Sequence, residues 1–273
     1  MAIKKMKPTS PGVRTMTYLV NETLTEKKPY KRLLVARKEF AGRNCHGRIT
    51  VRHHGGGVKH KYRIIDFNGC EKMGIEGTVE SIAYDPNRSA NIALISYVDG
   101  DRRYILAPQK LEVSHKVIVN DRAPIMPGNR MFVKNIPPGV AIFNIEINKG
   151  KGGQICRSAG NSCVVVSHDG IYTQIRMPSG GVRYVNKECM VSVGVLSNED
   201  WNLLNFGKAG RKRRMGWRPT VRGSAMNPCD HRHGGGNGKC PIGLPGPVTP
   251  WGKKAYGVKT RKHKYSDKWL VKE

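Results

Sequence analysis

The chain has 273 residues, of which 38% are hydrophobic and 7% aromatic, and it contains 32 Gly and 16 Pro. It is long enough for one or two domains with cores of their own, but much of it has too few apolar side chains to pack conventionally. The formal net charge of +28 predicts a polyanionic partner, because so strong a field repels itself unless counter-charge is present.

The positive charge lies at the two ends of the chain. Residues 1–63 hold 16 Lys and Arg against 3 Asp and Glu, residues 207–273 hold 17 against 3, and the stretch between holds 15 against 14. Pro and Gly interrupt both ends, which excludes an amphipathic helix lying on a membrane. We therefore predict a nucleic-acid partner and no membrane.

Cysteine usage and hydropathy indicate the compartment. Seven cysteines lie scattered without a disulfide framework, which predicts reduced thiols in a reducing compartment. No apolar run reaches the roughly 18 residues of a membrane span, and we expect neither a signal peptide nor a transit peptide at the start. Five of the cysteines are expected only to fill space: Cys45, Cys70, Cys156, Cys163 and Cys189.

Residues 1–61 show little periodicity and are expected to form a basic N-terminal extension. Residues 17–20 and 32–35 fit short strands or extended pieces bound to RNA. In residues 42–59 basic side chains alternate with Gly and polar groups, so these side chains have phosphates to reach and no core to join. A disordered basic tail is an equal alternative for the isolated protein.

A first small barrel is expected over residues 62–125. Asp99-Gly100 stands between two apolar runs, 91–98 and 102–106, and is a strong hairpin signal. About five short strands fit between residues 62 and 119. Without crossover helices the sheet must be antiparallel, and closing it into a barrel removes its free edges.

A second small antiparallel barrel is expected over residues 126–206. A hairpin is predicted at 163–176, followed by strands at 182–185 and 190–195. Residues 198–206 are the one plausible short helix, with an Asn or Asp cap. Residues 141–148 alternate, which predicts a strand with one apolar and one polar face: Ala141, Phe143, Ile145 and Ile147 against Asn144, Glu146 and Asn148.

Residues 207–273 are expected to form a basic C-terminal extension, which opens with the run 208–214. Aromatic residues spaced among Lys and Arg suit stacking on bases or sugars, or packing on the second barrel: Trp217, Trp251, Tyr256, Tyr265 and Trp269. For Trp217 we favour packing.

Residues 224–239 are the most unusual stretch. Four glycines fall within residues 234–238, which excludes a helix or a central strand. Glycines let backbone N–H groups approach a phosphate, and Arg222, Arg232 and Lys239 add positive charge. We predict a loop threaded into folded RNA, with an ordinary surface loop as the alternative.

Two other functions are considered. Cys229, His231, His233 and Cys240 offer two sulfurs and two imidazoles to zinc, and with Asp230 as base they would make a hydrolase site. Their spacing lacks the paired C-x-x-C units of common structural zinc sites. A free nucleic-acid chaperone would use the same positive charge for weakly selective binding.

The stretch 149–154 resembles a nucleotide-binding loop only superficially, because the full P-loop pattern is absent. Two interpretations of this stretch remain: a loop whose backbone N–H groups bind RNA, and a plain turn between strands.

Long motifs at 42–67, 84–94, 102–108, 149–154, 157–160, 218–223 and 225–238 together resemble the L-two family of large-subunit ribosomal proteins, in its bacterial and organellar form. The resemblance implies an OB-fold-like barrel followed by an SH3-like barrel, with arms embedded in the large-subunit rRNA. It implies a structural protein, not an enzyme, that supports subunit association, tRNA binding and RNA-catalysed peptidyl transfer. The implied partners are rRNA, other ribosomal proteins and the small subunit, with Mg²⁺ entering only through the bound rRNA.

The resemblance places Asp230 and His231 in the family's functionally sensitive loop. Cys229, Arg232 and Asn237 stand where the family pattern has valine, proline and glutamate. Loss of the proline predicts a less rigid loop, and Arg232 adds a donor for phosphate. Such drift points to an organellar or fast-changing genome, so the ribosome is expected in a bacterial cytoplasm or an organelle.

The residues expected to bind RNA are basic side chains and histidines of the extensions and of the barrel loops. They are Arg43, Arg48, Arg52, His53, His54, Lys59, Arg63, Arg88, Arg102, Arg103, Lys149, Lys151, Arg157, Arg211, Lys212, Arg213, Arg214, Arg218, Arg222, Arg232, His233, Lys239 and Lys262.

Overall fold

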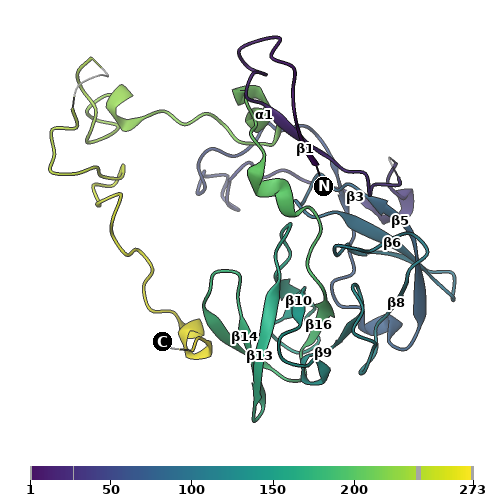
Figure 1. The fold of residues 1–273 in the computed structure, drawn as a ribbon. Helices are drawn as coiled ribbons and strands as arrows, with labels where there is room; N and C mark the ends of the chain where they lie inside the picture. The colour runs from purple at the N-terminus through teal and green to yellow at the C-terminus, as the bar shows by residue number, and fades with distance from the viewer. Residues whose placement is uncertain (1, 27, 238–240, 272–273) are drawn as a thin grey trace. The chain divides into compact units, whose positions relative to one another are not determined.

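The computed structural model describes residues 2–26, 28–237 and 241–271, and the chain divides into two compact units. The barrel unit comprises Met1–Lys38, Lys59–Lys208 and Lys268–Glu273, and the basic unit comprises Glu39–Val58 and Ala209–Asp267. Figure 1 traces the chain and shows that its regular structure is mainly β. Within the described ranges, no helix has the length and apolar character needed to cross a membrane.

The first barrel is built on an antiparallel sheet in the order β7-β6-β5-β8, of which Figure 1 labels β5, β6 and β8. Its strands are β5 (Glu76–Ala83), β6 (Ile92–Tyr97), β7 (Arg102–Leu106) and β8 (Lys116–Ile118). The predicted hairpin around Asp99-Gly100 is confirmed, since β6 and β7 pair from Ile92 opposite Leu106 onward. A short sheet of β3 (Leu34–Ala36) and β4 (Lys61–Arg63) accompanies it.

Strand β6 is buried on both faces, which explains its nearly continuous apolar sequence. Ala93 and Ile95 pack into a core with Val79 on one face. Ile92 and Leu94 face the other way, into a cluster that also holds Phe143 and Leu196 from the second half of the unit. The two barrels therefore share apolar packing across β6.

The second barrel is built on a six-stranded antiparallel sheet in the order β15-β14-β13-β10-β16-β9. Its strands are β9 (Arg130–Phe132), β10 (Ala141–Phe143), β13 (Cys163–Asp169), β14 (Tyr172–Arg176), β15 (Val182–Asn186) and β16 (Met190–Val193). The predicted hairpin at 163–176 is confirmed as β13–β14. Two short strands, β11 (Ile145–Glu146) and β12 (Gly153–Ile155), form a separate pair beside it.

Both ends of the chain contribute to the barrel unit. Strand β1 (Ala2–Lys5) pairs with β2 (Thr17–Val20), and Thr17 N donates to Asn205 O at 3.0 Å. Near the other end, Val271 N donates to the carbonyl of Val182 at 3.0 Å. The ring of Trp269 lies 5.3 Å from that of Tyr172 in an edge contact, so this tryptophan packs on the second barrel.

The expected short helix at 198–206 is a 3-10 helix, Glu199–Leu203, and its expected cap is wrong. Asn198 is in the left-handed region, with φ 68°, and makes no capping hydrogen bond. Its amide Nδ2 donates instead to Ser89 O at 2.7 Å, so the side chain joins the helix to the first barrel. The one α-helix among the described residues is α1 (Ala209–Arg214). It lies within the basic run 208–214, where no helix was expected from the sequence.

The expectation of one continuous strand over 141–148, with one apolar and one polar face, is also wrong. Asn144 has a φ of 49° and separates β10 from β11. Both Asn144 and Glu146 are buried, with Glu146 fully so. Alternation of apolar and polar residues does not predict burial correctly here, because the buried Arg130 donates hydrogen bonds to Asn144 O and Glu146 Oε1.

Arg130 is the polar centre of the barrel unit. Its Nη2 donates to Glu146 Oε1 at 2.8 Å, Nη1 to Asn144 O at 2.9 Å, and Nε to Asn68 O at 2.8 Å. The Arg130 and Glu146 side chains are only 5% and 0% exposed. Burial lowers the pKa of Arg130, and the carboxylate of Glu146 opposes that shift.

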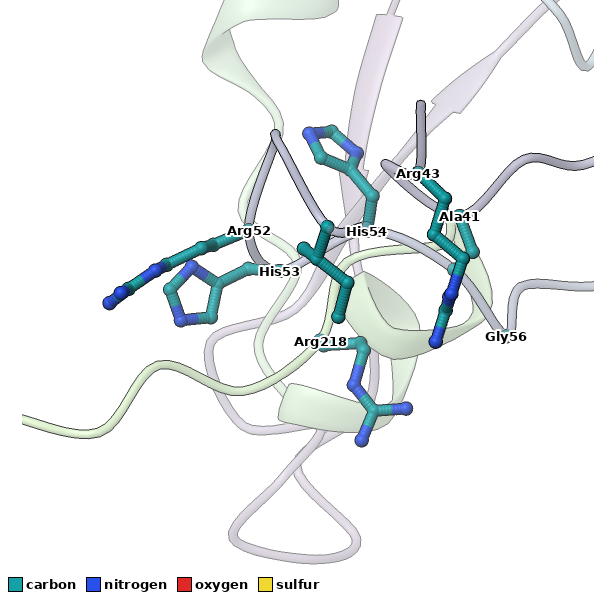
Figure 2. Close-up of a pocket in the computed structure, with 9 residues that line it drawn as sticks. Ala41, Arg43, Arg52, His53, His54, Gly56 and Arg218 are labelled. Atoms are coloured by element: carbon teal, nitrogen blue, oxygen red, sulfur yellow. The ribbon is translucent and has the colours of Figure 1, made fainter. Parts of the chain in front are cut away.

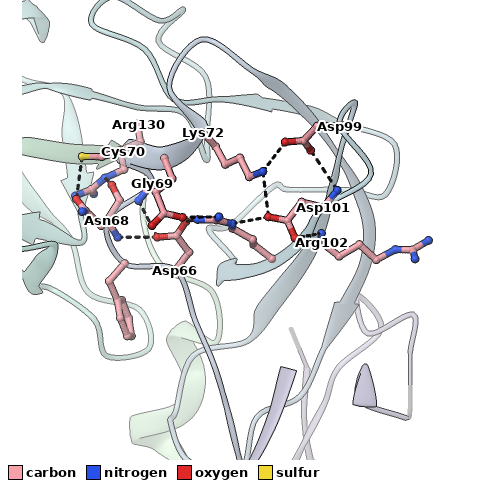
Figure 3. Close-up of polar contacts among 12 residues, drawn as sticks. Asp66, Asn68, Gly69, Cys70, Lys72, Asp99, Asp101, Arg102 and Arg130 are labelled. Atoms are coloured by element: carbon pink, nitrogen blue, oxygen red, sulfur yellow. Dashed lines mark hydrogen bonds and ion pairs between the residues drawn. The ribbon is translucent and has the colours of Figure 1, made fainter. Parts of the chain in front are cut away.

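The neighbouring contacts extend this network toward β7 (Figure 3). Asp66 Oδ1 accepts the N–H groups of Asn68 and Gly69 at 2.9 and 2.7 Å, and Asp66 Oδ2 accepts from Arg103 Nη1 at 3.0 Å. Lys72 Nζ lies 3.0 Å from Asp101 Oδ2, and the same carboxylate also contacts Arg103. The segment 66–69 is thus held by the first barrel and itself holds Arg130.

Replacing Arg130 with methionine leaves the carboxylate of Glu146 buried without its counter-charge. We expect Arg130→Met to lower the free energy of unfolding by about 3–5 kcal/mol, and a double variant Arg130→Met with Glu146→Leu to recover much of that loss. Urea denaturation followed by circular dichroism measures both.

Lys116→Met is the matched control, because it breaks an ion pair with Glu76 whose members are 68% and 49% exposed. Exposed pairs contribute little to stability, so this variant should unfold almost as the parent does. A similar loss for Arg130→Met and Lys116→Met would contradict the role given to the buried pair.

Candidate nucleic-acid interface

Residues 42–51 of the basic unit form a loop closed by their own backbone. Gly42 O accepts the N–H groups of Thr50 and Val51 at 3.0 and 3.1 Å, and Asn44 Oδ1 accepts two more backbone N–H groups. Gly42 has a φ of 74°, and a Cβ there would lie 2.0 Å from the Val51 carbonyl oxygen. Glycine is required at this position by both strain and space.

The second segment of the basic unit binds the first through α1 and the turn after it. Arg213 Nη1 donates to Gly55 O at 2.6 Å and to Gly56 O at 3.0 Å. Gly55 N donates to Gly216 O at 2.8 Å. A Cβ on Gly56 would lie 2.4 Å from Arg213 Nη2, so the glycine makes room for the guanidinium.

Aromatic contacts continue this junction. The rings of His54 and Trp217 lie 4.7 Å apart, and Arg218 N donates to His53 O at 3.0 Å. Trp217 therefore packs, as expected, but its partner is a histidine of the basic unit and not the second barrel. It remains 47% exposed.

A cavity of about 610 Å³ opens between the two segments (Figure 2). It is lined by Ala41, Arg43, Ile49, Arg52, His53, His54, Gly55, Gly56 and Arg218. Figure 2 shows the side chains of Arg43, Arg52 and Arg218, which come from both segments, and the residues that line the cavity include no Asp or Glu. Within the described ranges, Arg43, Arg52 and Arg218 form no ion pair, and the nearest carboxylate that the structure places beside the cavity wall is that of Glu39, whose Oε1 lies 3.8 Å from the position of a Cβ on Gly55.

The cavity's cations are held in place by other means. Arg52 lies over the ring of Trp251, with its Cζ 5.3 Å from the ring centroid. Trp251 is itself 73% exposed, which leaves apolar ring surface beside the cation. Arginine and an exposed aromatic ring at the rim of a basic cavity suit a nucleotide, since one binds phosphate and the other stacks on a base or sugar.

The loop around His231 is held by the histidines themselves. His231 is only 7% exposed, and its Nδ1 accepts the N–H of His233 at 3.0 Å. His233 Nε2 accepts the N–H of Val248 at 3.0 Å. These two ring nitrogens carry no proton in this arrangement, because each is an acceptor. The hydrogen bonds give the loop a defined course even with arginine at 232.

The zinc-dependent hydrolase is not favoured. Among the described residues no group of three or more His, Cys, Asp or Glu is placed to hold a metal ion. Cys229 is an exposed free thiol. Cys240 and Lys239, which the sequence placed in this region, lie outside the described residues.

In the barrel unit, carboxylates neutralise several of the predicted RNA-binding arginines. Arg88 Nε lies 2.6 Å from fully buried Asp85, and Arg63 Nε lies 3.8 Å from it. Arg102 pairs with Glu80 at 2.7 Å. The Arg103 guanidinium contacts Asp66, Glu71 and Asp101 at 2.6–3.0 Å. These arginines therefore have carboxylate partners within the chain itself.

Arg157 differs from them because no carboxylate faces it in the described part of the chain. Its Cζ lies 3.8 Å from the centroid of the Phe67 ring, and Arg88 lies over the same ring at 5.7 Å. Burial, and then the like charge of Arg88, lower the pKa of Arg157. Because Arg88 is already paired with Asp85, Arg157 is the cation on this ring that an incoming phosphate would stabilise.

The stretch 149–154 is a packed turn. Gly153 N donates to Phe67 O at 2.9 Å, and a Cβ on Gly153 would lie 2.3 Å from Asn144 O. Lys149 pairs with Glu188 at 2.7 Å, whereas Lys151 is exposed. Gly152 packs against Phe67 and Asn68, and Gly153 against Asn144, whereas nothing lies within 4 Å of a Cβ on Gly150.

Five of the predicted RNA-binding residues line the cavity: Arg43, Arg52, His53, His54 and Arg218. The other described residues of that prediction are spread over both units. Exposed elsewhere are Arg48, Lys59, Lys149, Lys151, Lys212, Arg214, Arg222, Asp230, Arg232 and Lys262. Half-buried elsewhere are Arg63, Arg88, Arg102, Arg103, Arg157, Arg211, Arg213 and His233.

Sequence reasoning missed the structural arginine and its partner, Arg130 and Glu146. The available signal was a charged residue inside an apolar strand pattern, at the start of 130–133 and in the middle of 141–148. Buried charges in such positions need each other.

Comparison with known families gives two matches, which together cover most of the chain. The model described as Ribosomal Proteins L2, RNA binding N-terminal domain, matches residues 30–119. The model described as Ribosomal Proteins L2, C-terminal domain, matches residues 126–252. The order of the two matches is that of the two barrels, in agreement with an OB-fold-like barrel followed by an SH3-like barrel.

The His231 loop depends on space left by Gly223, where a Cβ would lie 2.5 Å from the imidazole ring. We expect Gly223→Ala to displace the ring and break the bond from His233 N to His231 Nδ1. Hydrogen–deuterium exchange at the amides of His233 and Gly234 should become faster.

Gly210→Ala is the control, since nothing lies within 4 Å of a Cβ at this position in α1. Alanine also favours a helix over glycine. Equal exchange in the His231 loop of both variants and the parent would contradict this account of the loop.

Proposed function

The chain belongs to the ribosomal protein L2 family, whose members are structural, rRNA-binding proteins of the large ribosomal subunit, and from that premise we propose which parts of it contact the RNA. The basic unit is the principal rRNA-binding part, and its cavity takes a phosphate group with the adjoining nucleotide. The observation that carries this proposal is that Arg43, Arg52 and Arg218 line the cavity and that none of them forms an ion pair among the described residues.

The charge of the basic unit supports the same assignment. Its residues hold 17 Lys and Arg against 3 Asp and Glu. Binding of such a surface to RNA releases condensed counterions, so affinity is high at low salt and falls steeply as salt is added. The barrel unit pairs many of its arginines internally and contributes a smaller positive spot at Arg88 and Arg157.

We further propose that the loop carrying Asp230 and His231 supports subunit association, tRNA binding and the peptidyl transferase centre. Asp230 is exposed, whereas His231 is buried and accepts a backbone hydrogen bond. This placement favours a histidine that shapes the loop against RNA over one that transfers protons. The chemistry of peptide-bond formation then belongs to the RNA, and Mg²⁺ enters only with it.

The partners that follow are the large-subunit rRNA, neighbouring ribosomal proteins and the small subunit at an intersubunit bridge. The ribosome that holds the chain is bacterial or organellar. Sedimentation tests this placement directly: the chain should travel with large subunits at salt concentrations that strip weakly bound proteins. Recovery wholly outside ribosomal fractions would favour a free nucleic-acid chaperone.

Neutralising the cavity should weaken RNA binding, because fewer guanidinium groups then reach phosphates. We expect Arg43→Gln, Arg52→Gln and Arg218→Gln together to lower affinity for large-subunit rRNA and to reduce the slope of log K against log salt by about 1 for each phosphate that is no longer neutralised. Filter binding across a salt series measures both quantities.

Lys116→Gln removes one charge from an exposed ion pair outside the cavity and should leave the slope unchanged. If the triple variant and this control have the same slope, the cavity is not where phosphate binds.

Removing the imidazole of His231 should affect the ribosome without unfolding the barrels. We expect His231→Ala to keep the circular dichroism and melting of the parent protein, because the ring lies outside both barrel cores. Large subunits assembled with this variant should associate less well with small subunits and make less peptide. Unchanged translation by such subunits would count against the role of the loop.

A further inference from the structure

Two thiols face each other at the edge of the second barrel. The Sγ atoms of Cys156 and Cys163 lie 2.8 Å apart, and both cysteines are free. Cys163 opens β13 and is fully buried, while Cys156 follows β12 and is half-buried. Cys156 is therefore the cysteine of this pair that keeps some exposed surface.

The backbone keeps this pair together. Cys156 O accepts the N–H of Asn144 at 3.0 Å, and Cys163 is paired with Ile142 in the sheet, so both cysteines are tied to the same short stretch. A disulfide brings its sulfurs to about 2.05 Å, which leaves an approach of about 0.8 Å. Cys156 also has a φ of 54°, in the left-handed region that a non-glycine residue rarely adopts.

The two thiols have different chemical characters. A hydrogen bond from Cys163 lowers the pKa of Cys156, which favours its thiolate. The same bond and burial raise the pKa of Cys163. The thiolate is the nucleophile in thiol–disulfide exchange, and Cys156 is half-buried whereas Cys163 is fully buried, so Cys156 is assigned as the attacking sulfur and Cys163 as the resolving one.

We propose that Cys156 and Cys163 are a modification site at which a low-molecular-weight disulfide, such as oxidised glutathione, forms a reversible intramolecular disulfide. Cys156 Sγ attacks one sulfur of oxidised glutathione and releases one glutathione thiolate, which takes up a proton. Cys163 then loses its proton, attacks Cys156 Sγ and displaces the second glutathione thiolate. Two protein thiols are oxidised and one glutathione disulfide is reduced to two glutathiones.

The bond has a consequence for the residue that follows Cys156. Arg157 lies on Phe67, and the turn after it is held by Ala159 N donating to Ser89 Oγ at 3.0 Å and Gly160 N donating to Ser197 O at 3.1 Å. Because the bonds at Ala159 and Gly160 hold the turn, a movement of Cys156 toward Cys163 must displace Arg157, which lies between Cys156 and these bonds. This step rests on the proposed function: oxidation removes Arg157 from its phosphate and weakens binding to rRNA.

Trypsin gives a direct test, because Arg157 lies between the two cysteines. Cleavage after Lys151, Arg157 and Arg176 leaves Cys156 and Cys163 in separate peptides, 152–157 and 158–176. The full-length protein is treated with oxidised glutathione, alkylated, digested and analysed by mass spectrometry without reduction. We expect the two peptides to appear joined, and to separate on treatment with dithiothreitol.

Variants decide between this bond and general thiol oxidation. Cys163→Ser should keep glutathione attached to Cys156 and give no joined peptide, whereas Cys45→Ser, which removes an exposed thiol, should still give it. Peptides 152–157 and 158–176 that stay separate in the parent, while Cys45 carries glutathione, would overturn the proposal.

Binding to large-subunit rRNA is then compared for oxidised and reduced protein. We expect oxidation to reduce the salt slope by about 1, as for Arg157→Ala, and to have no further effect on that variant. An unchanged slope in protein that carries the disulfide would overturn the link to Arg157. Absence of rRNA binding in both states would sink the proposed function and leave the disulfide result standing.

Discussion

The fold of the barrel unit depends on one buried ion pair. Arg130 contacts Glu146, the carbonyl of Asn144 and the carbonyl of Asn68, so a single guanidinium joins both barrels. A buried ionised group without a partner is costly, and the two groups are tolerated together because each nitrogen of the guanidinium donates to an oxygen. The hydrogen bonds of this pair are directional and fix how the two barrels are oriented. The apolar packing across β6 is not directional and fixes that orientation less strictly.

The two units treat positive charge in opposite ways. In the barrel unit arginine is a structural residue, and Arg88, Arg102 and Arg103 each contact at least one carboxylate. In the basic unit the backbone and a few aromatic rings hold the chain, and Arg43 and Arg218 form no ion pair among the described residues. The basic unit holds 17 Lys and Arg against 3 Asp and Glu, so it has few carboxylates with which to neutralise its cations.

Much of this organisation is predictable from the sequence where the signal is local. The hairpins at Asp99-Gly100 and around residue 170 follow from turn chemistry beside apolar runs, and the uneven charge predicts a polyanion directly. The prediction of one strand at 141–148 is wrong because alternation says which residues share a face, but not that a distant arginine covers the polar one. The cavity and the Cys156–Cys163 pair escape sequence reasoning for a related cause, since both arise from contacts that no local pattern contains.

The basic unit is assembled from pieces far apart in the chain, and this affects the order in which it can be made. Arg213 and Gly55, which hold its two segments together, are 158 residues apart. Closing so long a loop costs entropy that only contacts made afterwards repay. During synthesis the early segment therefore leaves the ribosome well before its partner exists, with both barrels still to be translated. The surface that we propose binds RNA is completed only when nearly the whole polypeptide has emerged, so prematurely terminated chains would lack it even if their first barrel folds.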